Sequence, residues 1–109
     1  MRARASQQRK EISAEDFPAL REFLRGYFHE DMEDDYGSAV GAVEQFCQDS
    51  DPGQHRQVST EWERLMRELK GQPIEELNRV LVDILGSSQT VSAADIRKIS
   101  AALYRNDLD

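Results

Sequence analysis

The spacing of the apolar residues is the feature that most limits how this chain of 109 residues can fold. These residues recur every three or four positions, a period that places them on one side of an α-helix. One stripe comprises Phe17, Leu20, Phe23, Leu24, Tyr27 and Phe28, and the most apolar stripe comprises Ile74, Leu77, Val80, Leu81, Ile84 and Leu85. No stretch alternates between apolar and polar residues for long enough to predict a β-strand. The sequence therefore predicts an all-α fold.

Turn and cap residues divide the stripes into a single-domain bundle of about five short helices. The helices are expected near residues 17–29, 38–49, 55–70, 73–85 and 92–105. Ser38 is a candidate N-cap, and Ser92 with Asp95 resembles a capping box in which Asp replaces the usual Glu. Gly71 in a left-handed conformation is expected to end the third helix, and Pro73 to open the fourth. Because the connections are short, we expect sequence neighbours to pack roughly antiparallel.

Length and composition are typical of one globular domain of 12.5 kDa. Residues 1–12 are polar and basic and are predicted to form a disordered arm, whereas residues 13–109 form the helical domain. No apolar run approaches the ~20 residues of a membrane-spanning helix, and the first ten residues lack the apolar segment of a signal peptide. Cys47 is the single cysteine, so no disulfide can form within the chain. We therefore expect a cytoplasmic protein without a membrane partner.

Negative charge is concentrated in one third of the chain. The formal net charge is −7, and residues 16–51 contain ten acidic and two basic groups, a local net charge of −8. Such a field attracts basic surfaces and repels nucleic acid. A helix-turn-helix built on the last two predicted helices would use Arg97, Lys98 and Arg105, but three aspartates in the same region balance them. Nucleic-acid binding is therefore not expected.

Five carboxylates fall within the six positions from Glu30 to Asp35. Composition alone favours a solvated loop. A calcium loop counted from Asp31 fails, because its sixth place holds Tyr36 instead of Gly and its twelfth holds Ala42 instead of Glu. The second alternative to a solvated loop is a docking surface for a cationic partner, with neighbouring apolar and aromatic anchors. The predicted partner-binding residues are Glu30, Asp31, Met32, Glu33, Asp34, Asp35 and Tyr36.

Residues suited to catalysis are few. His29 and His55 lie in different predicted elements, and Cys47 lies on an apolar helix face, where cysteines are usually inert. A nucleophilic pair of Cys47 with His29, or His29 acting with nearby carboxylates, is a weak hypothesis. The sequence contains no phosphate-binding glycine loop and no zinc-protease or hydrolase motif. We therefore predict a protein that is not an enzyme, with no catalytic residue, metal, cofactor or small-molecule ligand.

Residues 16–47 resemble the first part of the contact-dependent growth inhibition immunity proteins (CdiI) of one helical subgroup. Members of that subgroup tend to read Tyr-Phe-His-Gln-Asp-Trp, then a short gap, then Tyr-Gly-Ser. The matching residues here are Tyr27, Phe28, His29, Asp31, Tyr36, Gly37 and Ser38. Glu30 and Met32 stand where the subgroup has Gln and Trp. Residues 39–46 are similar to the second helix of the family.

This resemblance implies a small cytoplasmic protein that neutralises a cognate toxin domain, the variable C-terminal part of a secreted CdiA-type protein. Many such toxin domains are nucleases, and a nuclease has a basic cleft that an acidic protein would cover. Tyr27, Phe28, His29 and Gly37, which the family shares, either bind the toxin or hold the fold. The alternative hypothesis is a small acidic helical adaptor or regulatory protein without a toxin partner.

Overall fold

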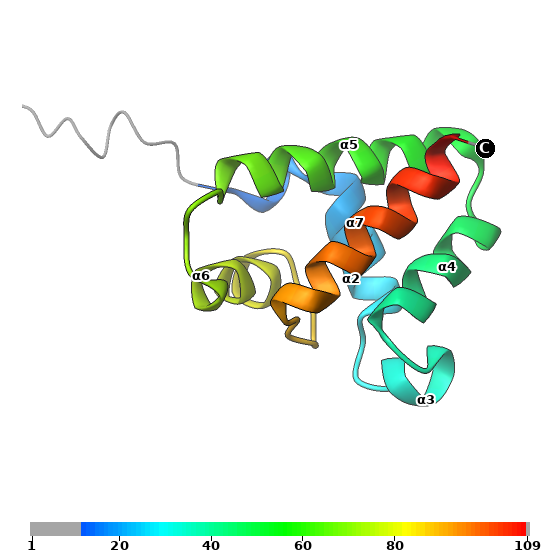
Figure 1. Cartoon of the computed structure of the whole chain (residues 1–109), viewed down its shortest axis with the longest axis horizontal. Coiled ribbons are helices and arrows are strands. Elements are labelled where there is room, and N and C mark those ends of the chain that lie inside the picture. Colours follow the sequence, from blue (N-terminus) through cyan, green and yellow to red (C-terminus); the bar gives the residue numbers. More distant parts are fainter. Residues whose placement is uncertain (1–11, 109) are drawn as a thin grey trace, which may run out of the picture.

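A computed structural model describes residues 12–108 of the chain, and within that range every regular element is helical (Figure 1). The predicted all-α fold is confirmed. In chain order the elements are the 3₁₀-helix η1 (Ala14–Asp16), α2 (Pro18–Tyr27), α3 (Met32–Tyr36), α4 (Ala39–Asp49), α5 (Pro52–Glu68), α6 (Ile74–Arg79), the π-helical turn η2 (Val80–Ile84) and α7 (Ala93–Leu108).

The predicted cap residues occupy the expected helix ends. The Ser38 hydroxyl accepts a hydrogen bond from the Gly41 N–H at 3.0 Å and starts α4. Ser92 and Asp95 bond to each other's backbone N–H at 3.1 and 3.0 Å, which is the predicted capping box before α7. Gly71 has φ +86° after α5, a left-handed conformation that glycine adopts without steric cost. These helix boundaries follow from local sequence chemistry alone.

Several helices differ from their predicted ranges. The helix α2 ends at Tyr27 rather than near residue 29, and α7 continues to Leu108 rather than ending near 105. The helix α5 begins at Pro52 rather than near residue 55, because the side chains of Asp51 and Gln54 form a reciprocal capping box with 2.8 and 3.0 Å bonds. The predicted helix 73–85 is α-helical only to Arg79 and then widens into η2, where the Leu85 N–H bonds to the Val80 carbonyl at 3.0 Å.

The acidic run, expected as a loop, forms the short helix α3. Glu33, Asp34 and Asp35 fall in its first turn, where the helix dipole favours negative charge, and Glu30 and Asp31 precede it. Met32 is 5% exposed and anchors the helix to the core. Gly37, with φ +84°, ends it by donating its N–H to the Glu33 carbonyl at 2.9 Å. A single buried side chain and a left-handed glycine therefore convert the run into a helix.

Helix packing does not follow sequence order. The main contacts join α4 with α7, α5 with α2, and α5 with α7, so the prediction that sequence neighbours pack together is wrong for these helices. In Figure 1, α5 runs along one side of the molecule and α7 crosses in front of α2. The Trp62 indole N–H of α5 donates to the Ser100 hydroxyl of α7 at 2.8 Å. The helix α5 therefore packs against both α2, early in the chain, and α7, late in it.

The predicted apolar stripes form the core. Among the residues named for the first and fourth predicted helices, Phe17, Leu20, Leu24, Leu77 and Leu81 are buried, while Ile84 is half-buried. Ile12 packs against this core. The rest of the predicted N-terminal arm, residues 1–11, lies outside the described residues. In the described part of the chain, no helix is both long enough and apolar enough to cross a membrane.

Candidate functional site

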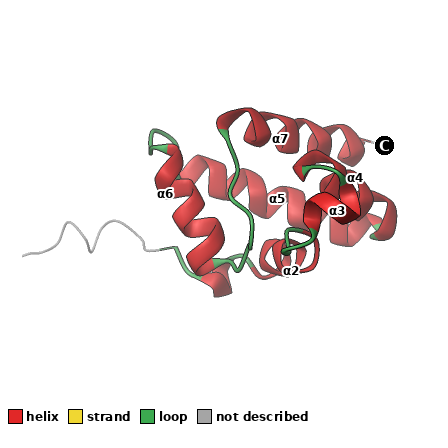
Figure 2. Ribbon diagram, turned by 90° about the horizontal axis from the view of Figure 1, so that it is seen from below, coloured by secondary structure: helices red, strands yellow, loops and turns green. Residues whose placement is uncertain are grey.

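The helix α3 lies at one end of the molecule, beside the start of α4 (Figures 1 and 2). All five carboxylate residues of the acidic run are exposed: Glu30, Asp31, Glu33, Asp34 and Asp35. We call these five residues the acidic surface. The fold exposes them because Met32 turns inward and Tyr36 packs on Tyr27, which leaves the three residues between them in solvent. The predicted carboxylates therefore do form one exposed cluster.

Met32 and Tyr36, the two other predicted partner-binding residues, lie differently. Met32 belongs to the hydrophobic core and is closed to a partner. Tyr36 is half-buried and stacks on Tyr27 with ring centroids 5.5 Å apart. Met32 therefore anchors α3 to the core, and of the two residues only Tyr36 is partly accessible to a partner.

Tyr27, at the end of α2, packs against α3 through Tyr36, and Phe28 next to it lies in the core. Phe28 is 1% exposed, and Tyr27 stacks on Phe23 at 5.6 Å as well as on Tyr36. The Tyr27 hydroxyl donates to the Asp49 carboxylate at 2.7 Å. Desolvation, followed by this hydrogen bond, raises the pKa of Tyr27 to about 12. The ring thus stays protonated and ties α2 to the end of α4.

His29 connects the end of α2 to the acidic surface. Its Nδ1 accepts the Asp31 backbone N–H at 3.1 Å, which places the ring proton on Nε2, 3.4 Å from the Asp35 carboxylate. Its backbone carbonyl accepts the Met32 N–H at 3.1 Å and the Gln89 side-chain amide at 2.8 Å. The predicted motif residue therefore organises α3 from both its ring and its backbone.

Two glycines are required where α3 meets α4. Gly37 supplies the positive φ that ends α3. At Gly41, an added Cβ would lie 2.1 Å from the Tyr36 carbonyl oxygen, so the two helices can approach closely only with glycine there. Sequence reasoning missed Gly41. Its signal was a glycine inside an otherwise apolar helical stripe.

Cys47 contacts His55 rather than His29. The Cys47 sulfur lies 3.7 Å from His55 Nε2, and that nitrogen also lies 3.1 Å from the Leu103 carbonyl, to which it donates. Burial chiefly raises the pKa of the Cys47 thiol to about 11, which makes it a poor nucleophile at neutral pH. Within residues 12–108, no group of three or more His, Cys, Asp or Glu side chains has the geometry to hold a metal ion.

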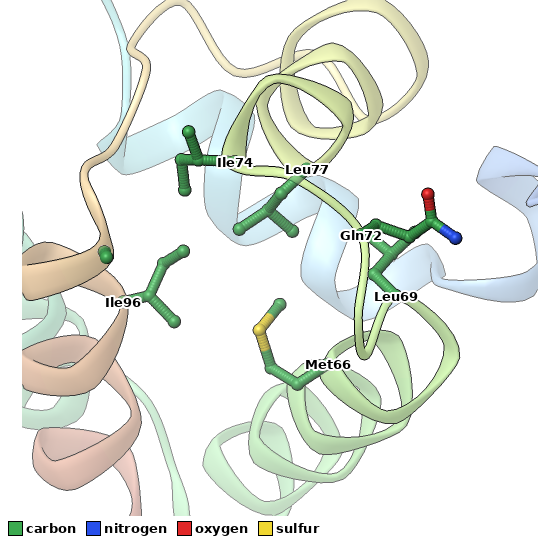
Figure 3. Close-up of a pocket in the computed structure, with 7 residues that line it drawn as sticks. Met66, Leu69, Gln72, Ile74, Leu77 and Ile96 are labelled. Carbon is green, nitrogen blue, oxygen red and sulfur yellow. The ribbon is translucent and has the colours of Figure 1, made fainter.

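An apolar groove of about 250 Å³ opens between the end of α5, α6 and the start of α7. Figure 3 shows Met66, Leu77 and Ile96 pointing toward one another across it. The lining residues are Met66, Leu69, Gln72, Ile74, Leu77, Ala93 and Ile96. The helix α6 lies at the opposite end of the molecule from α3 (Figure 1). Tyr104 on α7, 61% exposed, is the large hydrophobic residue that the described part of the chain leaves in solvent.

Comparison with protein-family models gives a match over most of the chain. A family model described as CdiI immunity protein matches residues 16–99, from the end of η1 into α7. The resemblance seen in residues 16–47 is thereby confirmed and extended across most of the chain. Searches of curated proteins and of solved structures give no significant match.

Proposed function

We propose that this chain, which belongs to the CdiI immunity protein family and is therefore a toxin-neutralising immunity protein, acts by occlusion. The partner is a cognate toxin domain from the C-terminal part of a CdiA-type protein. In this proposal the acidic surface on α3 covers a basic cleft of that domain in the cytoplasm. The chain binds and blocks its partner and catalyses nothing itself.

One observation supports the proposal most strongly: five exposed carboxylates lie in α3 and in the two residues that precede it, at one end of the molecule (Figure 1). Like charges held this close repel one another in the free protein, and a cationic partner relieves that repulsion. Met32 supplies the apolar anchor of α3, and within the described residues Asp35 is the one carboxylate of the five that pairs with another side chain, that of His29. This arrangement fits a surface kept for recognition.

The charge of the acidic surface also favours a class of toxin. A nuclease grips an anionic substrate with Lys and Arg side chains, and these form a basic cleft. A protein with a local net charge of −8 over residues 16–51 complements such a cleft. We therefore propose a nuclease as the partner.

The motif residues take a structural role in this proposal. Tyr27, Phe28, His29 and Gly37 hold α3 in place through stacking, burial, hydrogen bonds and a left-handed turn. Residues shared by proteins with different toxins are better suited to this task than to selecting one toxin. The exposed carboxylates are then the residues that meet the partner.

The test neutralises Asp31, Glu33, Asp34 and Asp35 together by substitution with Asn or Gln. Exposed charges at an interface act mainly on the association rate, through attraction screened over about 8 Å at physiological salt. We expect association with the toxin encoded immediately upstream to slow by about tenfold or more at low salt. The salt dependence of that rate should become weaker. Stopped-flow or surface binding kinetics at several salt concentrations measure both.

The matched control neutralises Glu63, Glu68, Glu75 and Asp83, four exposed carboxylates on other helices, and changes the net charge equally. A loss confined to the dissociation rate would mean that toxin arginines bury the α3 carboxylates directly, a contact of about 2–5 kcal/mol per truncated pair. If the two variants bind equally fast, the acidic surface is not the docking surface, and the groove and Tyr104 become the next surfaces to test. No binding to the upstream toxin by the unmodified protein would favour the adaptor hypothesis.

A further inference from the structure

We propose that Gln89 is a positioning residue for the acidic surface, acting through His29 from a loop 60 residues away in the sequence. The loop connects η2 to α7, and in Figure 2 it is the long green segment that leads into α7. The effect on toxin binding rests on the proposed function. The effect on the structure of α3 does not.

The loop itself is rigidly held at its first half. Gly86 turns the chain with φ +89°, and the Ser87 N–H then bonds to the Leu81 carbonyl at 2.8 Å. Ser87 is 3% exposed, and its hydroxyl donates to the Gln89 carbonyl at 2.7 Å while accepting the Gln89 N–H at 2.9 Å. Both backbone groups of Gln89 are therefore fixed by one buried serine.

The second half of the loop is held by α6. The Asn78 side-chain amide donates to the Val91 carbonyl at 2.9 Å and accepts the Val91 N–H at 2.7 Å. Val91 is 5% exposed. The Asn78 side chain thus bonds to both backbone groups of Val91, as a paired strand would. Gln89 therefore lies between two residues, Ser87 and Val91, whose positions are fixed.

From this position the loop supports the turn between α2 and α3. The Ser88 N–H donates to the Phe28 carbonyl at 2.9 Å, and the Gln89 side-chain amide donates to the His29 carbonyl at 2.8 Å. Carbonyls at the end of a helix lack partners within the helix; the loop supplies a donor for that of Phe28, the C-cap of α2, and a second donor for that of His29. The His29 ring, held in place in this way, accepts the Asp31 backbone N–H and lies against the Asp35 carboxylate, so it fixes both residues.

The helix α3 needs such support because five residues cannot sustain a helix in water. The His29 carbonyl accepts one hydrogen bond from Gln89 and one from the Met32 N–H. Without the Gln89 donor only the Met32 bond is left, and the first turn of α3 loosens. The five carboxylates remain, so long-range attraction is unchanged. What changes is the fixed arrangement in which they meet a partner.

The first experiment uses the free protein and the substitution Gln89→Met, which keeps the length of the side chain and removes the donor. The control is Gln57→Met at an exposed position on α5. We expect amide hydrogen exchange at Asp35 and Gly37, whose N–H groups close α3, to accelerate roughly fivefold, the worth of one net hydrogen bond. Core amides in α5 should keep their rates, and the NMR signals of the His29 ring should shift while those of His55 stay. Gln89→Lys, which restores a donor, should recover most of the protection.

The second experiment measures toxin binding by the same variants. For Gln89→Met we expect dissociation to accelerate roughly fivefold, with association rate and salt dependence unchanged. The proposal is overturned if α3 amides in Gln89→Met exchange as in the parent, or if exchange accelerates equally throughout the protein. Faster exchange in α3 with unchanged dissociation would support the positioning role and contradict the acidic surface as the toxin contact.

Discussion

The acidic surface and the helical core are stabilised in different ways. In the core, Trp62, Leu65 and Leu103 bury almost their whole side chains between α5 and its neighbours. In α3 only Met32 is buried, and the helix is otherwise held by hydrogen bonds to His29 and by Gly37. Burial therefore stabilises the core, whereas the carboxylates that we propose for toxin recognition lie outside it.

Replacing Leu81 by Ala tests the core side of this comparison and has the largest expected effect. Leu81 is fully buried, so the substitution loses transfer free energy and leaves a cavity. We expect the free energy of unfolding to fall by about 2–5 kcal/mol. Urea denaturation measures this, and Val82→Ala, at a half-buried neighbour, should cost less. Toxin affinity of the folded fraction should be unchanged, and a Leu81→Ala variant as stable as the parent would contradict the assigned core.

Replacing Gly41 by Ala tests where the two regions meet. The added Cβ collides with the Tyr36 carbonyl, so α3 and α4 must move apart. We expect a loss of about 1–3 kcal/mol in the free energy of unfolding, as for other overpacked sites, with NMR shift changes centred on residues 32–41. The control is Gly26→Ala in α2, where the added Cβ meets nothing within 4 Å. That variant should gain about 0.5–1 kcal/mol, and equal losses in both variants would refute the close approach.

High pH should weaken the contacts of Tyr27, which packs against Tyr36 of α3 and donates to Asp49. The pKa of Tyr27 is about 12 in the folded protein, chiefly because of desolvation, against 10.0 for an ordinary tyrosine. Its contribution to stability is therefore complete below pH 10 and is lost as the pH rises toward 12. With allowance for solvent around a half-buried ring, we expect a loss of about 1 kcal/mol. Thermal melts between pH 9 and 12 should show a shallower decline for Tyr27→Phe, and identical slopes would exclude this cause.

Removing divalent metal has the smallest expected effect, which is none. The acidic run lacks the spacing of a calcium loop, since Tyr36 and Ala42 occupy the places of its Gly and Glu. The melting temperature should be the same in EDTA and in millimolar calcium. A melting temperature lower by many degrees in EDTA would show that the acidic surface binds a structural ion. The acidic surface would then contribute to stability as the core does.

Local sequence chemistry predicted much of the fold. Apolar residues three and four positions apart define helices. Ser38 and Ser92 mark helix starts because each hydroxyl accepts a backbone N–H within a few residues, and Gly71 supplies the left-handed turn after α5. The carboxylates of the candidate site were equally visible as a run of charge. Their helical conformation was not, because α3 depends on the burial of Met32 and on the contacts of His29.

The sequence by itself determined the helical class, most helix boundaries, the location of the negative charge and the resemblance to an immunity family. Each of these depends on residues close together in the chain. Only the tertiary structure decided that α4 packs on α7, that Met32 turns inward, and that Gln89 bonds to the His29 carbonyl. These choices join residues far apart in sequence, and they are set by which apolar faces and unpaired carbonyls come together when the helices pack.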